Sequence, residues 1–179
     1  MRWEQLFADL EARFAAAAED DLSAEVADRV RSEVARIGLA ERLAVAVGGT
    51  VRVVTLGGAS ATGTVRRTGP DWLLLAEVHG ADVLVPIAAV AAVSGVPRGV
   101  AGPGGGGVVG ARLGLGSALR AIARDRLPVV LQLVDGTTTS GTVERVGRDH
   151  VEVAETVVRG AASATVIVPT SALAMLRRR

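Results

Sequence analysis

The chain is most informative in what it lacks. Its 179 residues include no cysteine, lysine, asparagine or tyrosine, and only two histidines. Without cysteine there are no disulfides, no thiolate nucleophiles and no structural zinc sites of the usual kind. Without lysine there is no phosphate-binding loop of the kind that needs one. These absences favour a protein that is not an enzyme and carries no cofactor.

Charge and hydropathy also limit the classes of partner. The 20 arginines nearly balance 19 acidic residues, so nucleic acid or anionic lipid could be bound only by a local patch. The opening residues mix charges into their apolar positions, unlike a signal peptide. The most apolar stretch, Val83 to Val96, is shorter than the roughly 20 residues that span a bilayer. We expect a cytoplasmic protein with no membrane partner.

The first 38 residues have helical periodicity. The apolar residues from Trp3 to Phe14 fall on one stripe of a helix, and those from Val26 to Ile37 fall on a second. Gly38 allows a break, after which Leu39 to Val47 predicts a further short helix. We therefore expect a helical N-terminal arm over residues 1–38.

After residue 49 the period changes to two, and one pattern occurs twice. Aligned at an offset of 78, residues 50–77 and 128–155 share ten identities in 28 positions, including the glycine pair Gly63 and Gly141. Past a variable loop, VLVPIAAVAAV from Val83 corresponds to VIVPTSALAML from Val166. This indicates an internal duplication.

Each copy predicts five short strands with turn residues between them. Asp135 and Gly136 mark a tight hairpin, and Gly63 and Gly141 lie inside the second strands, where a missing side chain permits a bend. Ser117 is predicted to cap a short helix before the second copy. The expected fold is α+β and mainly β. A helical arm (1–38) is followed by a five-stranded barrel (39–96), a glycine-rich linker (97–114) and a second barrel (115–179), each barrel preceded by a short helix.

This arrangement resembles the Sm-like barrel and its SH3-like relatives. VRVVTLGGASATGTV is similar to the first half of the Sm signature, in which two strands flank a small turn and the second contains glycine. The resemblance implies RNA as a ligand. From its opening MRWEQLFADLE, the whole chain is also similar to an uncharacterised actinobacterial family, and its composition is typical of high-GC coding.

The sequence departs from the Sm pattern at the base-binding positions. In that family the loop after the second strand carries an acid, a flat ring that stacks on a base, and an asparagine that bonds the base edge. Asp71 with Trp72 and Asp149 with His150 supply an acid and a ring, but the chain contains no asparagine. Val85 and Val168, each followed by proline, replace the Arg-Gly pair of the second Sm motif.

The other sequence motifs favour a structural interpretation over a chemical one. Gly102, Gly104 and Gly107 match GxGxxG, but no strand precedes them, so a linker is favoured over a phosphate site. His79 and His150 are not grouped with other ligands, so no metal site is predicted. The acidic residues shared by the two copies lie at turns and strand ends, which favours turn-capping over catalysis.

Four residues remain as candidates for nucleic-acid binding. Trp72 and His150 occupy the same repeat position and are predicted to project outward, where a ring could stack on a base. Arg120 and Arg124 lie one helical turn apart and could follow a phosphate backbone. The alternatives are that Trp72 packs against a helix and that the arginines form an ordinary solvated face.

Two functions from different classes follow. The first is a non-enzymatic binding module of duplicated Sm-like barrels with RNA as its most concrete ligand. The second is a scaffold that docks a protein partner or self-associates through the N-terminal helices.

Overall fold

The computed structural model describes residues 29, 31–32, 34–98, 113–155 and 164–178. Leu39–Arg179 forms one compact unit, separate from Met1–Gly38. Most of the predicted helical arm and residues Gly102 to Gly107 of the predicted linker lie outside the described residues. Within the described part, no helical segment has the length and apolarity needed to cross a membrane.

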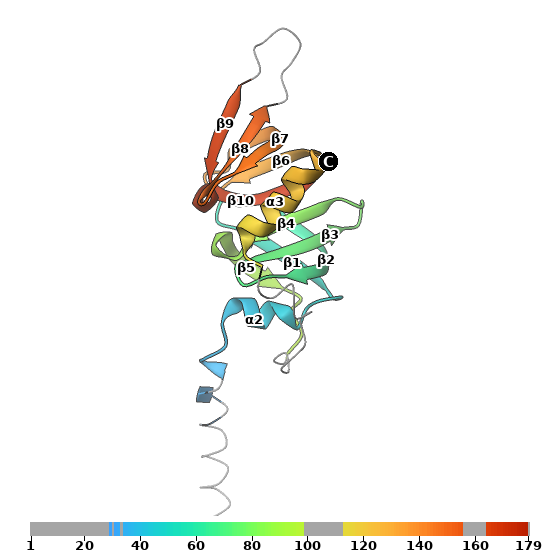
Figure 1. Cartoon of the computed structure of the whole chain (residues 1–179). Coiled ribbons are helices and arrows are strands. Elements are labelled where there is room, and N and C mark those ends of the chain that lie inside the picture. Colours follow the sequence, from blue (N-terminus) through green and yellow to red (C-terminus); the bar gives the residue numbers. More distant parts are fainter. Residues whose placement is uncertain (1–28, 30, 33, 99–112, 156–163, 179) are drawn as a thin grey trace, which may run out of the picture. The chain divides into compact units, whose positions relative to one another are not determined.

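Both copies of the repeat form the same series of elements (Figure 1). The first copy consists of α2 (Leu39–Ala44), β1 (Thr50–Thr55), β2 (Ser60–Thr68), β3 (Trp72–Glu77), β4 (Asp82–Pro86), the 3-10 turn η1 (Ile87–Ala89) and β5 (Val90–Ser94). The second consists of α3 (Leu115–Asp125), β6 (Pro128–Leu133), β7 (Thr138–Val146), β8 (His150–Glu155), β9 (Thr165–Pro169), the 3-10 turn η3 (Thr170–Ala172) and β10 (Leu173–Arg178). The prediction of a mainly β, α+β protein is confirmed.

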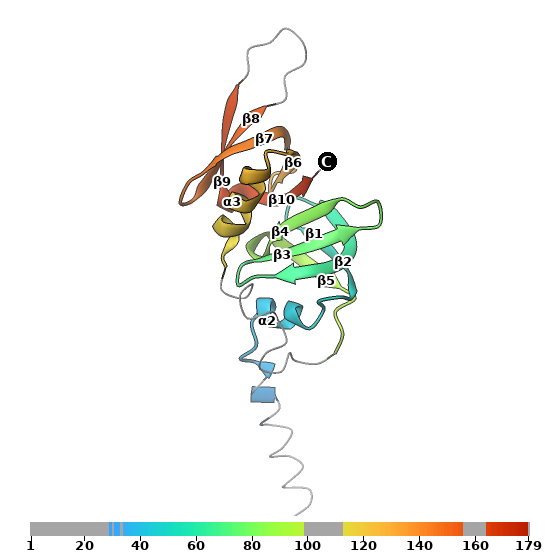
Figure 2. The ribbon, with the colours of Figure 1, turned by 45° about the vertical axis from the view of Figure 1, so that its right-hand side comes forward.

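The two closed barrels that the sequence predicts are not observed. The ten strands form a single open sheet in the order β5-β1-β2-β3-β4-β10-β6-β7-β8-β9. Each half has the same internal order, with its fifth strand beside its first. In the first half, β4 would have to pair with β5 to close a barrel, but β10 occupies the free edge of β4 (Figures 1 and 2). The sheet therefore continues from one half into the other.

The two copies of the repeat share the same irregularities in strand pairing. β2 pairs with β3, and β7 with β8, through a register shift at the same place, after Val65 and after Val143. Gly63 lies opposite Glu77, as Gly141 lies opposite Glu155. A Cβ at either glycine would overlap a backbone carbonyl of the neighbouring strand. These two glycines are required because only a residue without a side chain allows the strands to approach this closely.

Each half encloses a core of its own. The first core is built from alternate residues of β1 to β4 together with Leu43 of α2. The second is built from β6 to β10 together with Leu115 and Leu119 of α3. Separate cores explain how a continuous sheet can serve two copies of a small unit: each copy buries its own apolar face.

The junction between β4 and β10 exchanges side chains between the two cores. Met175 of β10 is buried in the first core, whereas Leu84 of β4 and Trp72 of β3 are buried in the second. Leu84 lies opposite Leu176 in the register. At the end of the junction Arg177 donates to Glu77 over 3.0 Å. The two halves therefore share apolar contacts, backbone pairing and an ion pair.

We predict that Gly63→Ala lowers the free energy of unfolding by about 1–3 kcal/mol, because the added methyl group forces β3 away from β2. Gly141→Ala should cost a similar amount. The matched control is Thr62→Ala at an exposed position of the same strand, which should change stability by less than about 0.5 kcal/mol. Urea unfolding of the three variants measures the difference, and equal stabilities would contradict the close approach of the strands.

Candidate nucleic-acid interface

Helix α3 is anchored at its start by the first half of the molecule. The backbone N–H of Leu115 donates to Oδ1 of Asp71 over 2.8 Å, and Nε1 of Trp72 donates to the carbonyl oxygen of Leu113 over 2.7 Å. Ser117, predicted as the cap, lies inside the helix, and the N-cap residue is Gly114. The capping prediction is wrong because the carboxylate that satisfies the helix start comes from a turn 44 residues earlier.

Trp72 does not project outward as predicted. Only 6% of the residue is exposed, and its ring lies against Gly69, where any side chain would collide with the indole. The ring belongs to the same core as Leu115 and Leu119. In this arrangement Trp72 holds α3 in place, and its ring is not presented to a base.

His150 occupies the equivalent position in the second copy, against Gly147, but it is more exposed. The exposed fraction of its side chain is 37%. Its Nδ1 lies 3.0 Å from Oδ1 of Asp149. The hydrogen bond from His150 lowers the pKa of the Asp149 carboxyl below its ordinary value. Arg120 and Arg124 line a groove beside α3, and His150 is not among the residues that line it.

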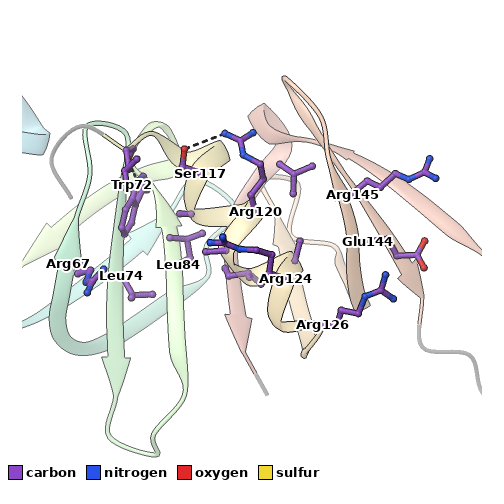
Figure 3. A pocket seen from close by; sticks show the side chains of 16 residues that line it. Arg67, Trp72, Leu74, Leu84, Ser117, Arg120, Arg124, Arg126, Glu144 and Arg145 are labelled. Atoms are coloured by element: carbon purple, nitrogen blue, oxygen red, sulfur yellow. Dashed lines mark hydrogen bonds between the residues drawn. The ribbon is translucent and has the colours of Figure 1, made fainter. Parts of the chain in front are cut away.

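That groove runs along α3 and has a volume of about 1160 Å³. Figure 3 shows α3 between the strands of the first half, which carry Trp72 and Leu84, and the strand that carries Glu144 and Arg145. Its apolar surface comes from Trp72, Leu74, Leu84, Ile122 and Val146, with smaller side chains of α3 between them. Both halves of the molecule therefore contribute to one groove.

Arginine dominates the polar lining. The groove contains Arg67, Arg120, Arg124, Arg126 and Arg145 against a single carboxylate, that of Glu144, a formal excess of four positive charges. Arg120 donates to the Ser117 hydroxyl over 3.3 Å, and Arg145 lies 3.9 Å from Glu152. Within the described part of the chain, no carboxylate forms an ion pair with the other three arginines. The groove therefore has a local positive field in a protein whose net charge is only +1.

Three of the four predicted binding residues line this groove: Arg120 and Arg124 as exposed charges, and Trp72 as a buried ring in its wall. Arg67 and Arg145, which were not selected from the sequence, come from equivalent positions on β2 and β7. They are identical in the two repeats and directly follow the shared register shift. Conservation between the copies at a bulge was the signal that could have identified them, because bulges re-aim side chains.

The described residues contain no cluster of three or more histidine or acidic side chains that could hold a metal ion. His79 is exposed in the turn between β3 and β4, far along the chain from His150.

Comparison with protein-family models, with curated protein sequences and with solved structures gives no match. The groove must be interpreted from its own geometry and charge.

We predict that Trp72→Ala lowers the free energy of unfolding by about 3–5 kcal/mol, because it opens a cavity beneath α3 and leaves the Leu113 carbonyl without its donor. Trp72→Phe keeps a ring in the core and should cost less. Urea unfolding followed by circular dichroism distinguishes the variants. A Trp72→Ala protein as stable as the wild type would mean that the ring is not a packing residue.

Proposed function

We propose that this protein is a non-catalytic cytoplasmic binding module built from two Sm-like units, and that its ligand is single-stranded RNA held along the α3 groove. The observation that carries the proposal is the set of five groove arginines, contributed by both halves and facing one carboxylate. The Sm-like classification is supported by the strand order common to both halves, by the short helix before each half, and by the second strands, each with a glycine and a register shift.

Phosphate is the group that best complements the groove. A guanidinium offers a planar fork of donors that matches phosphate oxygens, and it stays charged at any physiological pH. Arg120 and Arg124 extend from the same face of α3, while Arg67 and Arg145 flank the helix from β2 and β7 (Figure 3). Charges spread over three elements suit a chain of phosphates better than one small anion.

Single strands fit the groove better than a duplex does. The apolar surface from Leu74, Leu84 and Ile122 gives unstacked bases a place to leave water, which paired bases cannot use. Trp72 is already buried and asparagine is absent, so neither strong stacking nor base-edge readout of the Sm kind is available. Binding should therefore tolerate many sequences and depend strongly on salt.

The scaffold hypothesis, which relies on the N-terminal helices, falls largely on residues outside those that the structure describes. The edges of the sheet at β5 and β9 are a different surface, and they do not overlap the groove along α3.

We predict that Arg120→Ala combined with Arg124→Ala weakens RNA binding and flattens its salt dependence. For single strands the slope of log affinity against log salt is about 0.7 per neutralised phosphate, so losing two contacts should reduce it by about 1.4. Fluorescence anisotropy of a labelled oligouridine over a salt series measures both quantities.

The matched control removes two positive charges elsewhere. Arg52→Ala combined with Arg148→Ala changes the net charge by the same amount at exposed positions outside the groove. This control should keep the wild-type slope. Equal losses in the two double variants would reduce the effect to net charge, and an absence of RNA binding by the wild type would refute the proposal.

A further inference from the structure

The two ends of the sheet repeat the two sides of the β4 and β10 junction, but none of the described strands pairs with the outer edge of β5 or of β9. β9 is the counterpart of β4, and Ile167 is the counterpart of Leu84, since VIVP from Val166 aligns with VLVP from Val83. Leu84 is 2% exposed, because it lies in the core of the second half opposite Leu176 of β10, whereas Ile167 is 63% exposed. A large apolar side chain in the middle of an edge strand invites pairing with another strand.

The other end shows the complementary half. β5 is the counterpart of β10, and Ala91 and Ala92 correspond to Ala174 and Met175. Ala174 and Met175 are fully buried at the junction, and Met175 enters the core of the first half. Ala91 and Ala92 are both exposed. The positions that β10 buries at the junction are therefore exposed on β5, with the smaller Ala92 in place of Met175.

The short helices α2 and α3 show the same contrast between a buried residue and its exposed equivalent. Gly38-Leu39 opens the sequence around α2 as Gly114-Leu115 opens α3, and four residues later each helix has a fully buried leucine. Leu115 is 9% exposed because it packs against Trp72 of the first half. Leu39 is 40% exposed, and His150, the counterpart of Trp72, is partly exposed.

We propose that a second copy of this chain docks at these ends, β9 of one molecule pairing with β5 of the next in the geometry of the β4 and β10 junction. The contact is heterologous, because two different surfaces meet. Repeating it therefore produces a closed ring or an open filament rather than a two-fold dimer. Ile167 and His150 form the receiving surface, and Ala92 and Leu39 form the inserted one.

Charge distinguishes this contact from the internal junction. Arg177 and Arg178 pair with Glu77 and Asp82 within the chain. On β5 their counterparts are Ser94 and Gly95, so the contact between molecules lacks both ion pairs and consists of backbone bonds and apolar burial. Association should therefore persist at about 1 M salt, where the Debye length is only about 3 Å and RNA contacts are screened.

The test uses the full-length chain after nuclease treatment, with mass measured by light scattering over a concentration series at high salt. The wild type should assemble with rising concentration. Ile167→Arg places a charge on the receiving edge and should leave a monomer. The control, Val78→Arg, adds the same side chain at the 91% exposed turn between β3 and β4 and should assemble like the wild type. Urea unfolding checks that all three fold equally well.

A mixing experiment tests the direction of the contact. Ala92→Arg blocks the inserted edge and leaves the receiving edge intact, so it should also be monomeric alone. Mixed with Ile167→Arg, it should form a one-to-one heterodimer that grows no further. The Ala92→Arg chain contributes its intact receiving edge, and the Ile167→Arg chain contributes its intact inserted edge. An isologous dimer would not be rescued in this way.

The proposal is overturned by a wild type that stays monomeric, which would mean that another segment covers the edges. It is also overturned if Ile167→Arg and Val78→Arg assemble alike, or if the mixed variants remain monomers. The outcome of this test does not depend on the RNA proposal, because nuclease removes nucleic acid and high salt screens any remaining contacts with phosphates.

Discussion

The arrangement of this molecule depends on the pairing of β4 with β10. It joins two five-stranded units into one sheet, inserts Met175 into the first core and Leu84 into the second, and places Trp72 beneath α3. This pairing, together with the hydrogen bonds that join the start of α3 to Asp71 and Trp72, sets α3 of the second half beside β3 and β4 of the first and so forms the groove. Loss of the junction would therefore disrupt both cores and separate Arg67 from Arg120 and Arg124.

Both proposals follow from the duplication of a unit whose two sheet edges differ. Inside the chain, one receiving edge and one inserted edge meet and create a groove that neither half has alone. At the ends, the same two edges remain on β9 and β5, with Ile167 and Ala92 exposed where their counterparts are buried. In the two proposals, RNA binding uses the groove that the internal junction builds, and self-association repeats the junction between molecules.

Much of the fold could be predicted from local pattern. Period-two alternation located the strands, and the repeat fixed the equivalence of Gly63 and Gly141, because both signals act between neighbouring residues. Whether each half closes into a barrel could not be predicted, because β4 has the same sequence whether β5 or β10 pairs with its free edge. The start of α3 and the burial of Trp72 were missed for a related reason: Asp71 and the helix that it caps are distant in sequence. Arg120 and Arg124 could be grouped from the sequence because they are helical neighbours, whereas adding Arg67 and Arg145 to the candidate site required the assembled groove.

The most direct test of this account is hydrogen exchange of the backbone amides in the full-length chain at low and high protein concentration. The amides that β4 and β10 direct toward each other should be protected at both concentrations, because their partner is in the same chain. The edge amides of β5 and β9 should exchange fast when dilute and become protected when concentrated. Fast exchange between β4 and β10, or edges that never gain protection, would contradict the view that one junction builds both the groove and the assembly.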